Sequence, residues 1–366
     1  MTLSALVAAL TIVAPPDGVT VPTLKPAQRE YLSGTRSTRF VRMDNAADRS
    51  KLLLVGSAQQ PLHLEWTGET NVVYLLEIAR EGTEGQLFAV SNRTDAWITN
   101  LEIGSRFYWS VRPAGSLEMT SASFVTDGVA PRLLRAEGVR NFRDLGGWRT
   151  ADGQRVRQNM IFRSAGLRDK SKSSGNFIRR RHEPGARRVT DAGIETLRKD
   201  FGIRTDIELR TLQDMAGVSA SALGPDVRWV NVPMGAYANN PLGMAGMDTE
   251  AWGREPFAKL FRVFAKRESY PVLMHCSGGR DRTGTLAFLL NGLLGVAEDD
   301  LCRDWEASVF SDAGMKFVST RIGGLIAYLK TLPGDTLRDK VESYAKGCGI
   351  TAEEIASFRA IMLEPL

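Results

Sequence analysis

The chain has 366 residues, 43% of them hydrophobic and 24% charged, which is more than a single hydrophobic core usually accommodates. We therefore expect two globular domains and exclude a small disulfide-stapled scaffold. The longest helix-length apolar stretch, Thr283–Val296, is shorter than the about 20 residues that span a bilayer, so no membrane-spanning helix is expected.

The formal net charge of +5 is concentrated in one segment. Between Arg163 and Arg188, nine Lys or Arg residues stand against two acidic residues, so the rest of the chain is slightly acidic. A nucleic-acid binder would interleave aromatic residues with the basic ones, and this segment has only Phe177, so nucleic acid is not an expected partner. Either the segment is a solvated loop, or it makes weak contact with an anionic substrate or surface. The arginines concerned are Arg179, Arg180, Arg181, Arg187 and Arg188.

We predict that residues 1–36 form a signal sequence or an N-terminal segment. Leu3–Ala14 has the length and apolar character of a signal-peptide core, and Pro15-Pro16 interrupts it as a mature start would. No Lys or Arg precedes this stretch, so a packed helix in a cytoplasmic protein is the alternative. We expect a periplasmic or secreted protein.

From about residue 37 to 126, hydrophobic residues alternate with polar ones, which is typical of half-buried strands. Clusters of Gly, Asn and Thr separate the runs. This pattern predicts short antiparallel strands in an all-β sandwich over residues 37–131. The alternating residues are Leu62, Leu64 and Trp66, then Tyr74, Leu76 and Ile78, then Phe107, Trp109 and Val111.

After the turn at Thr126–Pro131, strand and helix patterns alternate, which predicts an α/β domain over residues 132–366. Phe201–Arg210 is strand-like, Ala251–Lys266 is helical, and an apolar run covers Pro271–Met274. A capping box, Thr351 with Glu354, begins the last predicted helix.

The three cysteines have no CxxC spacing and the three histidines are scattered, so no metal site is expected, and no cofactor. In an exported protein, a Cys302–Cys348 disulfide would leave Cys276 as the one free thiol. The sequence leaves open whether this bridge forms.

The segment His275–Gly284 (HCSGGRDRTG) lies between the apolar run and an apolar helix, an order that predicts strand, tight loop and helix. Backbone N–H groups of such a loop and the helix N-terminus form a cradle for an anion, and Gly278 and Gly279 allow the necessary backbone angles. The residues expected to bind phosphate are Ser277, Gly278, Gly279, Arg280, Asp281, Arg282 and Thr283.

Cys276 begins this loop, where nearby donors, the helix dipole and Arg282 favour the thiolate over the thiol. We therefore expect Cys276 to be a nucleophile. Arg282 can offer two parallel N–H donors to one phosphate group, and the Thr283 hydroxyl can donate to the sulfur. His275 is interpreted as a structural hydrogen-bonding residue, and Arg280 as either a ligand or a solvated side chain.

The loop resembles that of the bacterial branch of the cysteine-dependent tyrosine phosphatases, which reads HCxxGKDRTG. The segments Val139–Gly147, Ile161–Ala165 and Gly202–Thr205 resemble the same branch. The resemblance implies a phosphoric monoester hydrolase with a phosphocysteine intermediate, in which Cys276 is the nucleophile, Arg282 the phosphate ligand and Asp281 the loop acid. Two positions depart from the pattern: Arg280 replaces Lys, and Glu208 replaces Asp.

Residues 37–131 resemble a fibronectin type III or immunoglobulin-like module. The resemblance lies in Trp66 on an early strand and in the series Leu101, Gly104 and Phe107 before a late strand. The family usually has Tyr where this chain has Phe107. The ligand of this domain is not predicted.

A phenolate leaves poorly without a proton, so a general acid is required. Asp281 is the first candidate and Glu208 the alternative, with Asp206 and Asp214 also near the predicted strand. For Asp281 and for Glu208, the alternative is a purely structural role in which the carboxylate holds an arginine in position. We interpret the Asn141–Gly147 turn as a scaffold packed beside the loop.

Protein phosphotyrosine is the first substrate hypothesis, and a phosphoinositide or inositol polyphosphate is the alternative, favoured by the basic segment. Two other classes of protein compete with this interpretation. A rhodanese-like sulfurtransferase also begins an anion-binding loop with Cys, but Arg282-Thr283-Gly284 argues against it. An exported binding protein with an inactive phosphatase domain is the second.

Overall fold

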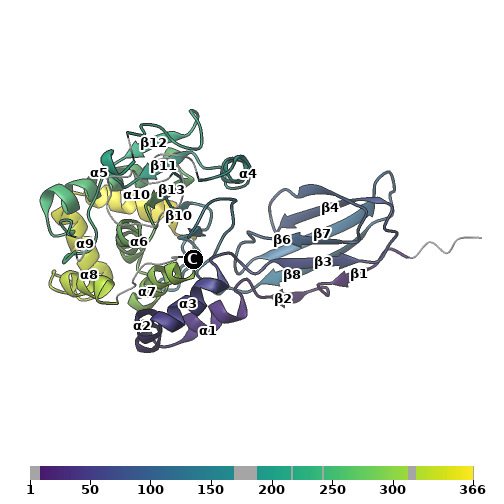
Figure 1. Cartoon of the computed structure of the whole chain (residues 1–366), viewed down its shortest axis with the longest axis horizontal. Coiled ribbons are helices and arrows are strands. Elements are labelled where there is room, and N and C mark those ends of the chain that lie inside the picture. Colours follow the sequence, from purple (N-terminus) through teal and green to yellow (C-terminus); the bar gives the residue numbers. More distant parts are fainter. Residues whose placement is uncertain (1–8, 169–187, 216, 241–242, 312–318, 366) are drawn as a thin grey trace, which may run out of the picture. The chain divides into compact units, whose positions relative to one another are not determined.

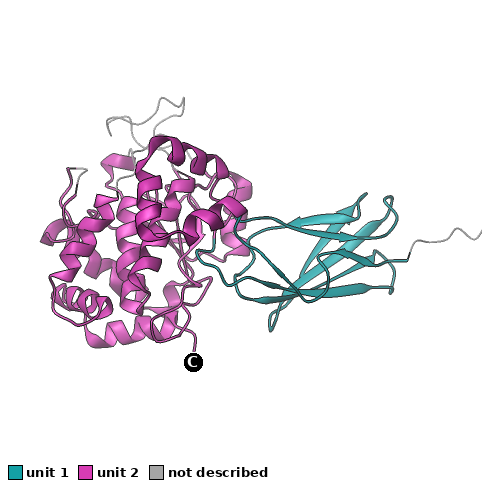
Figure 2. Cartoon of the chain, turned by 90° about the horizontal axis from the view of Figure 1, so that it is seen from below, with its two compact units in different colours: residues 1–25, 59–132 teal, residues 26–58, 133–366 magenta. Residues whose placement is uncertain are grey.

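The computed structural model describes residues 9–168, 188–215, 217–240, 243–311 and 319–365. The chain divides into two compact units (Figure 2). Unit 1 consists of residues 1–25 and 59–132, and unit 2 of residues 26–58 and 133–366. The chain therefore passes between the units three times.

Unit 1 consists of two β-sheets (Figure 1). The three-stranded sheet has the order β1 (Ile12–Ala14), β3 (Leu62–Trp66), β6 (Asp95–Ile98). The five-stranded sheet has the order β2 (Val19–Val21), β8 (Thr120–Thr126), β7 (Arg106–Pro113), β4 (Val73–Arg80), β5 (Gln86–Ser91).

Both sheets of unit 1 contribute to one hydrophobic core. Trp66 of β3, Leu76 of β4 and Trp109 of β7 are buried in it, and the alternating side chains of these strands are exposed or half-buried. The period-two pattern therefore predicted these strands correctly. One pair differs from the prediction, since β2 runs parallel to β8.

The predicted sandwich range 37–131 is wrong for residues 37–58, which are helical or lie beside helices and belong to unit 2. The helices are α1 (Pro26–Ser33), α2 (Arg36–Asp44) and α3 (Ala46–Val55). The Thr35 side chain accepts the N–H of Thr38, and the Asn45 side chain accepts those of Ala47 and Asp48. These caps satisfy N–H groups that begin each helix, which favours helix over strand.

The predicted N-terminal segment 1–36 also contains strands. Ile12–Ala14, the end of the apolar stretch interpreted as a signal-peptide core, pairs with β3, and Val19–Val21 pairs with β8. The last residues of that stretch therefore belong to the sheets of unit 1.

Unit 2 contains a five-stranded sheet with helices around it (Figure 1), as the α/β pattern predicts. The strand order is β12 (Arg228–Asn231), β11 (Thr205–Glu208), β13 (Val272–Cys276), β10 (Ile161–Ala165), β9 (Arg143–Asp144). The central strand β13 is parallel to both neighbours and all of its residues are buried. The longer helices are α5 (Glu255–Phe264), α6 (Asp281–Leu294), α7 (Glu298–Glu306), α8 (Thr320–Lys330), α9 (Leu337–Gly347) and α10 (Ala352–Met362).

Shorter elements connect these helices and strands. They are α4 (Asp191–Glu195), the π-helical turns at Thr196–Asp200 and Glu250–Arg254, and the 3₁₀ turns at Gln213–Met215, Arg267–Ser269 and Ala307–Phe310. In the described part of the chain, no helix is long and apolar enough to span a membrane.

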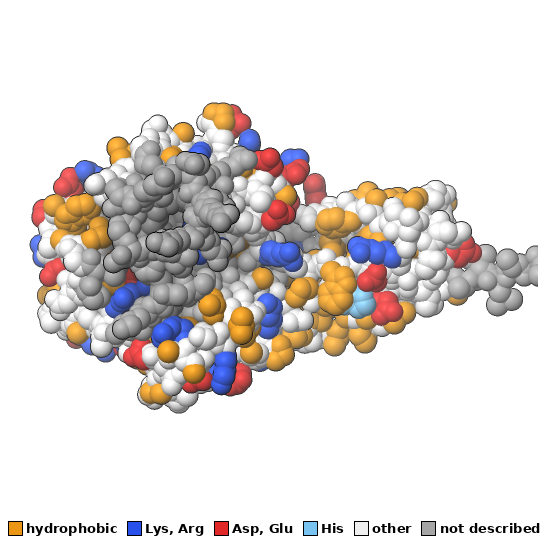
Figure 3. Space-filling model, viewed as in Figure 1, with side chains coloured by type: hydrophobic (Ala, Val, Ile, Leu, Met, Phe, Trp, Pro, Cys, Tyr) orange, Lys and Arg blue, Asp and Glu red, His pale blue; other side chains and the backbone are white. Residues whose placement is uncertain are grey.

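Several large hydrophobic side chains remain exposed on unit 1, and Figure 3 shows such side chains over its strands. Trp97 on β6 is 56% exposed and stacks on His63 of the neighbouring strand, with ring centroids 4.4 Å apart. The others include Leu87, Phe88, Tyr108, Leu117 and Met119.

A buried ion pair joins the helices at 26–58 to the rest of unit 2. The Arg39 side chain of α2 is fully buried, donates to Glu306 of α7 through Nε, and donates to Asp299 at 2.5 Å. Burial raises the pKa of Glu306 to about 7, even though the charge of Arg39 lowers it.

Replacing Arg39 by Met is expected to destabilise the protein by about 3–5 kcal/mol near pH 8, because Glu306 then remains buried without its counter-charge. Its folded-state pKa would rise further above the unfolded value, so the loss should shrink as the pH falls towards 5. Urea unfolding at both pH values measures this. The control Arg42→Met removes a surface pair with Glu30 and should change stability by less than about 1 kcal/mol. Equal losses for the two variants would contradict a buried-charge effect.

Candidate active site

Cys276 is the last residue of β13, and the loop that follows leads directly into α6. The Cys276 side chain is buried, with the residue 3% exposed. Gly279 has a φ of +67°, and a Cβ at this position would lie 2.3 Å from the carbonyl oxygen of Ser164 on β10. A side chain there is excluded by backbone, so only glycine lets the loop pass this close to β10.

Two side chains hold the carbonyl groups of the loop. The Asn141 amide donates to the Gly278 oxygen at 2.9 Å, and Arg163 Nη2 donates to the Gly279 oxygen at 2.6 Å. In a planar trans peptide, the C=O and the following N–H point in opposite directions. The N–H groups of Gly279 and Arg280 are therefore directed away from Asn141 and Arg163, as an anion cradle requires.

Asp304 of α7 orients the two arginines of this scaffold. Arg143 Nε donates to Asp304 Oδ1 at 2.9 Å, and Arg163 Nη1 donates to Oδ2. Arg143 also donates to the Asn141 side-chain oxygen at 2.6 Å. Burial raises the pKa of Asp304, but the charges of Arg163 and Arg143 outweigh it and hold the pKa below its usual value. The Asn141–Gly147 turn therefore acts as the predicted scaffold.

The environment of Cys276 favours the thiolate. Burial raises the pKa of the thiol, but the charge of Arg282 and the hydroxyl and N–H of Thr283 lower it, with a net result below the usual value. In contrast, burial raises the pKa of Cys302 to about 12 and that of Cys348 to about 11. Cys276 is thus the thiol that ionises first.

Arg282 lies in the first turn of α6 and reaches the loop after β11. Its Nη1 donates to the Leu209 carbonyl at 3.3 Å and to Asp214 Oδ2 at 3.2 Å, and its side chain is 11% exposed. The Ser277 hydroxyl is buried in the loop and has no hydrogen-bond partner among the described residues. Both groups are donors that an oxyanion at Cys276 could accept from.

Asp281 is surrounded by donors. Its Oδ1 accepts from the Tyr237 hydroxyl at 3.0 Å, from Arg280 Nε at 3.2 Å and from Arg321 at 3.3 Å, and Oδ2 accepts from Arg280 Nη2 at 3.2 Å. Burial raises the pKa of Asp281, but Arg280 first, then Arg321 and the Tyr237 hydroxyl lower it, with a net result below the usual value. Arg280 is fully buried, so the interpretation of Arg280 as a solvated side chain is wrong.

His275 lies between two carboxylates of the neighbouring strand β11. Its Nε2 is 2.7 Å from Asp206 Oδ1, and its Nδ1 is 3.3 Å from Glu208 Oε2. Burial lowers the pKa of His275, but Glu208 and Asp206 raise it, with a net result above the usual value. Asp206 and Glu208, two residues apart on β11, lie on the same face of the strand, since both reach His275.

Glu208, the alternative acid, is paired with an arginine. Arg210 donates to its two oxygens at 2.9 Å (Nε to Oε1) and 2.6 Å (Nη2 to Oε2), and the Arg210 N–H donates to Oε1 at 3.0 Å. The side chain is 3% exposed. These contacts favour the structural role that the sequence left open for Glu208.

Most of the basic segment, including Arg179, Arg180, Arg181 and Arg187, lies outside the described residues. Arg188 is described and half-buried. Burial lowers its pKa, and so do the positive charges of Arg140 and Arg210. Arg140 and Arg210 therefore both lie close enough to Arg188 to act on its charge, and Arg210 also interacts electrostatically with Cys276.

Four residues of the site were missed by sequence reasoning: Tyr237, Asp304, Trp305 and Arg321. No motif marks any of them. The one signal in the sequence is the group of glycines near Tyr237. In the structure, a Cβ on Gly246 would lie 2.0 Å from the Tyr237 carbonyl oxygen, so this glycine allows the close packing of the loop that holds Tyr237.

All three cysteines are free in the structure, so the Cys302–Cys348 bridge that the sequence left open is not formed. Cys302 is buried on α7, and Cys348 caps the end of α9. Among the described residues, no group of three or more His, Cys, Asp or Glu side chains could hold a metal ion.

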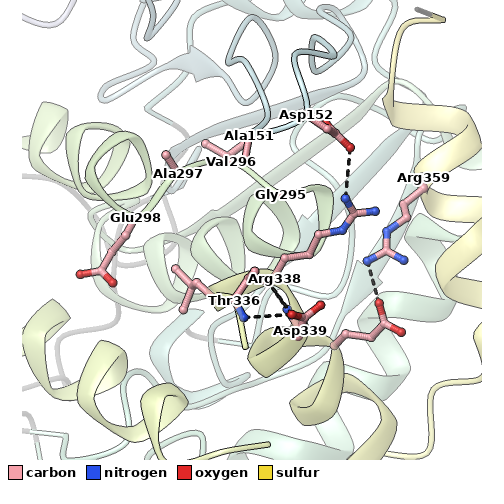
Figure 4. Close-up of a pocket in the computed structure, with 12 residues that line it drawn as sticks. Ala151, Asp152, Gly295, Val296, Ala297, Glu298, Thr336, Arg338, Asp339 and Arg359 are labelled. Atoms are coloured by element: carbon pink, nitrogen blue, oxygen red, sulfur yellow. Dashed lines mark hydrogen bonds and ion pairs between the residues drawn. The ribbon is translucent and has the colours of Figure 1, made fainter. Parts of the chain in front are cut away.

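A pocket of about 500 Å³ lies at the far end of α6 (Figure 4). Gly295 and Val296, which follow α6, line it, together with the ion pairs Arg338–Asp152 and Arg359–Glu342. A helix of 14 residues, about 20 Å long, separates this end from the Cys276 loop. The pocket is therefore distinct from the candidate active site, which is a loop closed around a buried thiol.

Residues 134–183 and 175–364 match the model of the tyrosine phosphatase family, so the chain belongs to this family and the predicted family is confirmed. The chain is 30% identical over 190 residues to the "Putative tyrosine-protein phosphatase H16_A0669" of Cupriavidus necator, covering 47% of this chain and 61% of that protein. It is 29% identical over 134 residues to a tyrosine-protein phosphatase of Nostoc commune, covering 33% of this chain and 45% of that protein. The chain thus spans less than two thirds of the length of either relative.

Among solved structures, the chain resembles the core catalytic domain of the PP-IP phosphatase SIW14 from S. cerevisiae, solved in complex with citrate. The two are 13% identical, the match covers 50% of this chain and 86% of that chain, and the TM-score is 0.30.

The pKa difference among the thiols predicts selective alkylation. Cys276 is expected to react with iodoacetamide with a pH midpoint below the about 8.5 of a free cysteine. Replacing Arg282 by Leu removes the nearby positive charge and should move this midpoint upward. Mass spectrometry of the alkylated peptides over a pH series measures both. A midpoint that does not change in the variant would remove Arg282 from the ionisation of Cys276.

Proposed function

We propose that this protein hydrolyses phosphomonoesters through a phosphocysteine intermediate. The observation that carries the proposal is the buried Cys276 thiol with a lowered pKa, at the head of a loop whose carbonyl groups are held outward by Asn141 and Arg163. The Cys276 sulfur attacks phosphorus, an S–P bond forms, and the P–O bond to the leaving group breaks. Water then attacks phosphorus, the S–P bond breaks, phosphate leaves and the thiolate is restored.

The charge that develops on the transferred group needs fixed donors. The N–H groups of the loop supply a cradle for its oxygens, and Arg282 supplies a planar pair of donors. Arg282 now donates to Leu209 and Asp214, at 3.3 and 3.2 Å. These partners hold the guanidinium beside the thiol until phosphate replaces one of them.

Asp281 is the proposed general acid, and in the second step the same carboxylate accepts the proton of the attacking water. Arg280 and Arg321 keep its pKa low, so the acid form is populated at acidic pH and is lost as the pH rises. The thiolate form of Cys276 sets the opposite limit at low pH. The proposed activity therefore has an acidic optimum for substrates that need protonation.

Protein phosphotyrosine is the first proposed substrate. An inositol polyphosphate or phosphoinositide is the second, favoured by the positive charges of Arg140 and Arg210 that act on Arg188, since further phosphate groups are attracted to such charges. SIW14 is named a PP-IP phosphatase, and this name describes that protein alone. Comparing kcat/KM for a phosphotyrosine peptide with that for inositol hexakisphosphate at low and high salt distinguishes the two candidates.

For unit 1, we propose a β-sandwich of the fibronectin type III or immunoglobulin-like kind. Two sheets that share one core support this, as does the stacking of Phe107 on Phe124, with ring centroids 5.3 Å apart, at the position where the family has Tyr.

We also propose export to the periplasm or beyond. Because Ile12–Ala14 forms β1, a signal sequence would have to be cleaved before Ile12 for this strand to remain.

Replacing Cys276 by Ser tests the proposed function. Turnover of p-nitrophenyl phosphate is expected to fall by at least about 10³-fold, because a serine hydroxyl is far less ionised than this thiol. Binding of vanadate should remain within a fewfold of the unchanged protein, since the donors are intact. The control Cys348→Ser should keep full turnover. Substantial turnover in Cys276→Ser would exclude the phosphocysteine route.

Replacing Asp281 by Asn tests the acid. Turnover of an alkyl phosphate should fall by about 10²-fold or more, whereas p-nitrophenyl phosphate, whose leaving group needs little protonation, should lose much less. Steady-state kinetics on both substrates measure the difference. The same comparison for Glu208→Gln is expected to show equal losses on both. If Asp281→Asn also shows equal losses, Asp281 serves loop structure instead.

A further inference from the structure

Tyr237 is held in an unusual backbone conformation close to the proposed acid. Its φ is +57°, a region that aromatic residues rarely adopt and that persists only when the surroundings enforce it. Its N–H donates to the Thr285 hydroxyl at 3.2 Å, and its carbonyl accepts the Met247 N–H at 2.7 Å. The residue is fully buried. The fold therefore fixes both the position and the direction of this side chain.

The chemistry of Trp305 determines which way the Tyr237 proton points. Trp305 Nε1 is 2.9 Å from the Tyr237 hydroxyl oxygen, and an indole N–H can only donate. The hydroxyl oxygen is thus the acceptor in that bond, and its own proton is available for Asp281 Oδ1, 3.0 Å away. Burial raises the pKa of Tyr237 well above its usual value, so the hydroxyl stays protonated.

The donors to Asp281 are unequally distributed. Within the described part of the chain, Oδ1 accepts from Tyr237, Arg280 and Arg321, whereas the bond to Oδ2 comes from Arg280. An oxygen that accepts three donors has little capacity to hold a proton as well. The proton of the acid form consequently belongs on Oδ2.

We propose that Tyr237 is a positioning residue of the catalytic site: with its hydroxyl aligned by Trp305, it orients Asp281 so that Oδ2 carries the proton given to the leaving group. The proposal rests on the proposed phosphatase function with Asp281 as acid. Tyr237 contacts Asp281, and Trp305 contacts Tyr237. Both act through the carboxylate.

The charged groups that face Asp281 determine the expected pH dependence. They are Arg280 from the loop, Arg321 from α8 and the Cys276 thiolate, while Tyr237 contributes a neutral donor. Removing the Tyr237 hydroxyl takes away a donor that stabilises the carboxylate, so the pKa of Asp281 should rise. Because the acid form is the active one, the limb of the pH profile on which activity falls with rising pH should move to higher pH.

The test is Tyr237→Phe, which retains the ring. At its optimum pH, kcat for an alkyl phosphate is expected to fall by about tenfold, a fraction of a full acid contribution, with less than about threefold loss for p-nitrophenyl phosphate. KM should change little. For the alkyl phosphate, the limb of the pH profile on which activity falls with rising pH should move to higher pH. The matched control is Tyr270→Phe, which removes a buried hydroxyl bonded to the Phe264 carbonyl at 2.5 Å and should leave both rates and the limb unchanged.

Two further variants separate positioning from structural damage. Trp305→Phe keeps the hydroxyl but removes the donor that aligns it, and should reproduce the leaving-group effect to a smaller degree. In Tyr237→Phe/Trp305→Phe, no indole N–H is left buried without a partner, so the stability loss should be smaller than the sum of the losses of the two single variants. The leaving-group effect should persist. If it disappears in the double variant, the role is structural and the proposal is overturned.

Equal losses on both substrates, or an unmoved limb in Tyr237→Phe, would also overturn it. If Tyr237→Phe does not fold, Trp305→Phe alone decides by the same two readouts. Failure of the phosphatase function itself is recognised differently, by turnover that survives Cys276→Ser.

Discussion

The buried pairing of Asp304 with Arg143 and Arg163 is the interaction on which the site depends. One carboxylate orients two guanidinium groups, and these reach the loop directly at the Gly279 carbonyl and through Asn141 at the Gly278 carbonyl. Because each carbonyl is turned outward, the following N–H is turned the other way. A buried ion pair is weak evidence for stability, but here it orients backbone dipoles that an anion can use.

Three consecutive residues at the end of α7 contact three different parts of unit 2. Asp304 orients the scaffold arginines, Trp305 donates to Tyr237, and Glu306 pairs with Arg39 of α2. A helix places successive side chains about 100° apart, so one turn can reach three neighbours. The helices at 26–58 belong to unit 2, although they lie in the sequence between two strands of unit 1. Through Arg39 they are held to the same helix that supports the loop and the proposed acid.

Two opposing electrostatic demands meet at the first turn of α6. The proposed nucleophile, Cys276, requires a lowered pKa, and Arg282 and Thr283 lower it. An acid needs its pKa near the working pH, yet Arg280 and Arg321 lower that of Asp281. Different arginines therefore act on the two groups: Arg282 favours the thiolate of Cys276, whereas Arg280 and Arg321 oppose the acid form of Asp281.

The sequence by itself determined the parts of the protein that depend on local patterns. The anion-binding role proposed for the loop from His275 to Gly284 depends on its own backbone and side chains, so ten consecutive residues were enough to predict its place, its nucleophile and its arginine. The alternation of Leu64, Trp66 and Trp109 likewise predicted strands, since a strand exposes and buries alternate residues. The helices at 26–58 were missed because their caps, Thr35 and Asn45, are common residues and their buried arginine looks like a surface one.

Only the tertiary structure decided which groups surround each carboxylate. Glu208 is paired with Arg210, whereas Asp281 accepts from Tyr237 and Arg321, which come from separate segments. Trp305, from a further segment, donates to Tyr237. A pKa and a hydrogen-bond direction depend on which groups burial brings together, and no spacing along the chain encodes that.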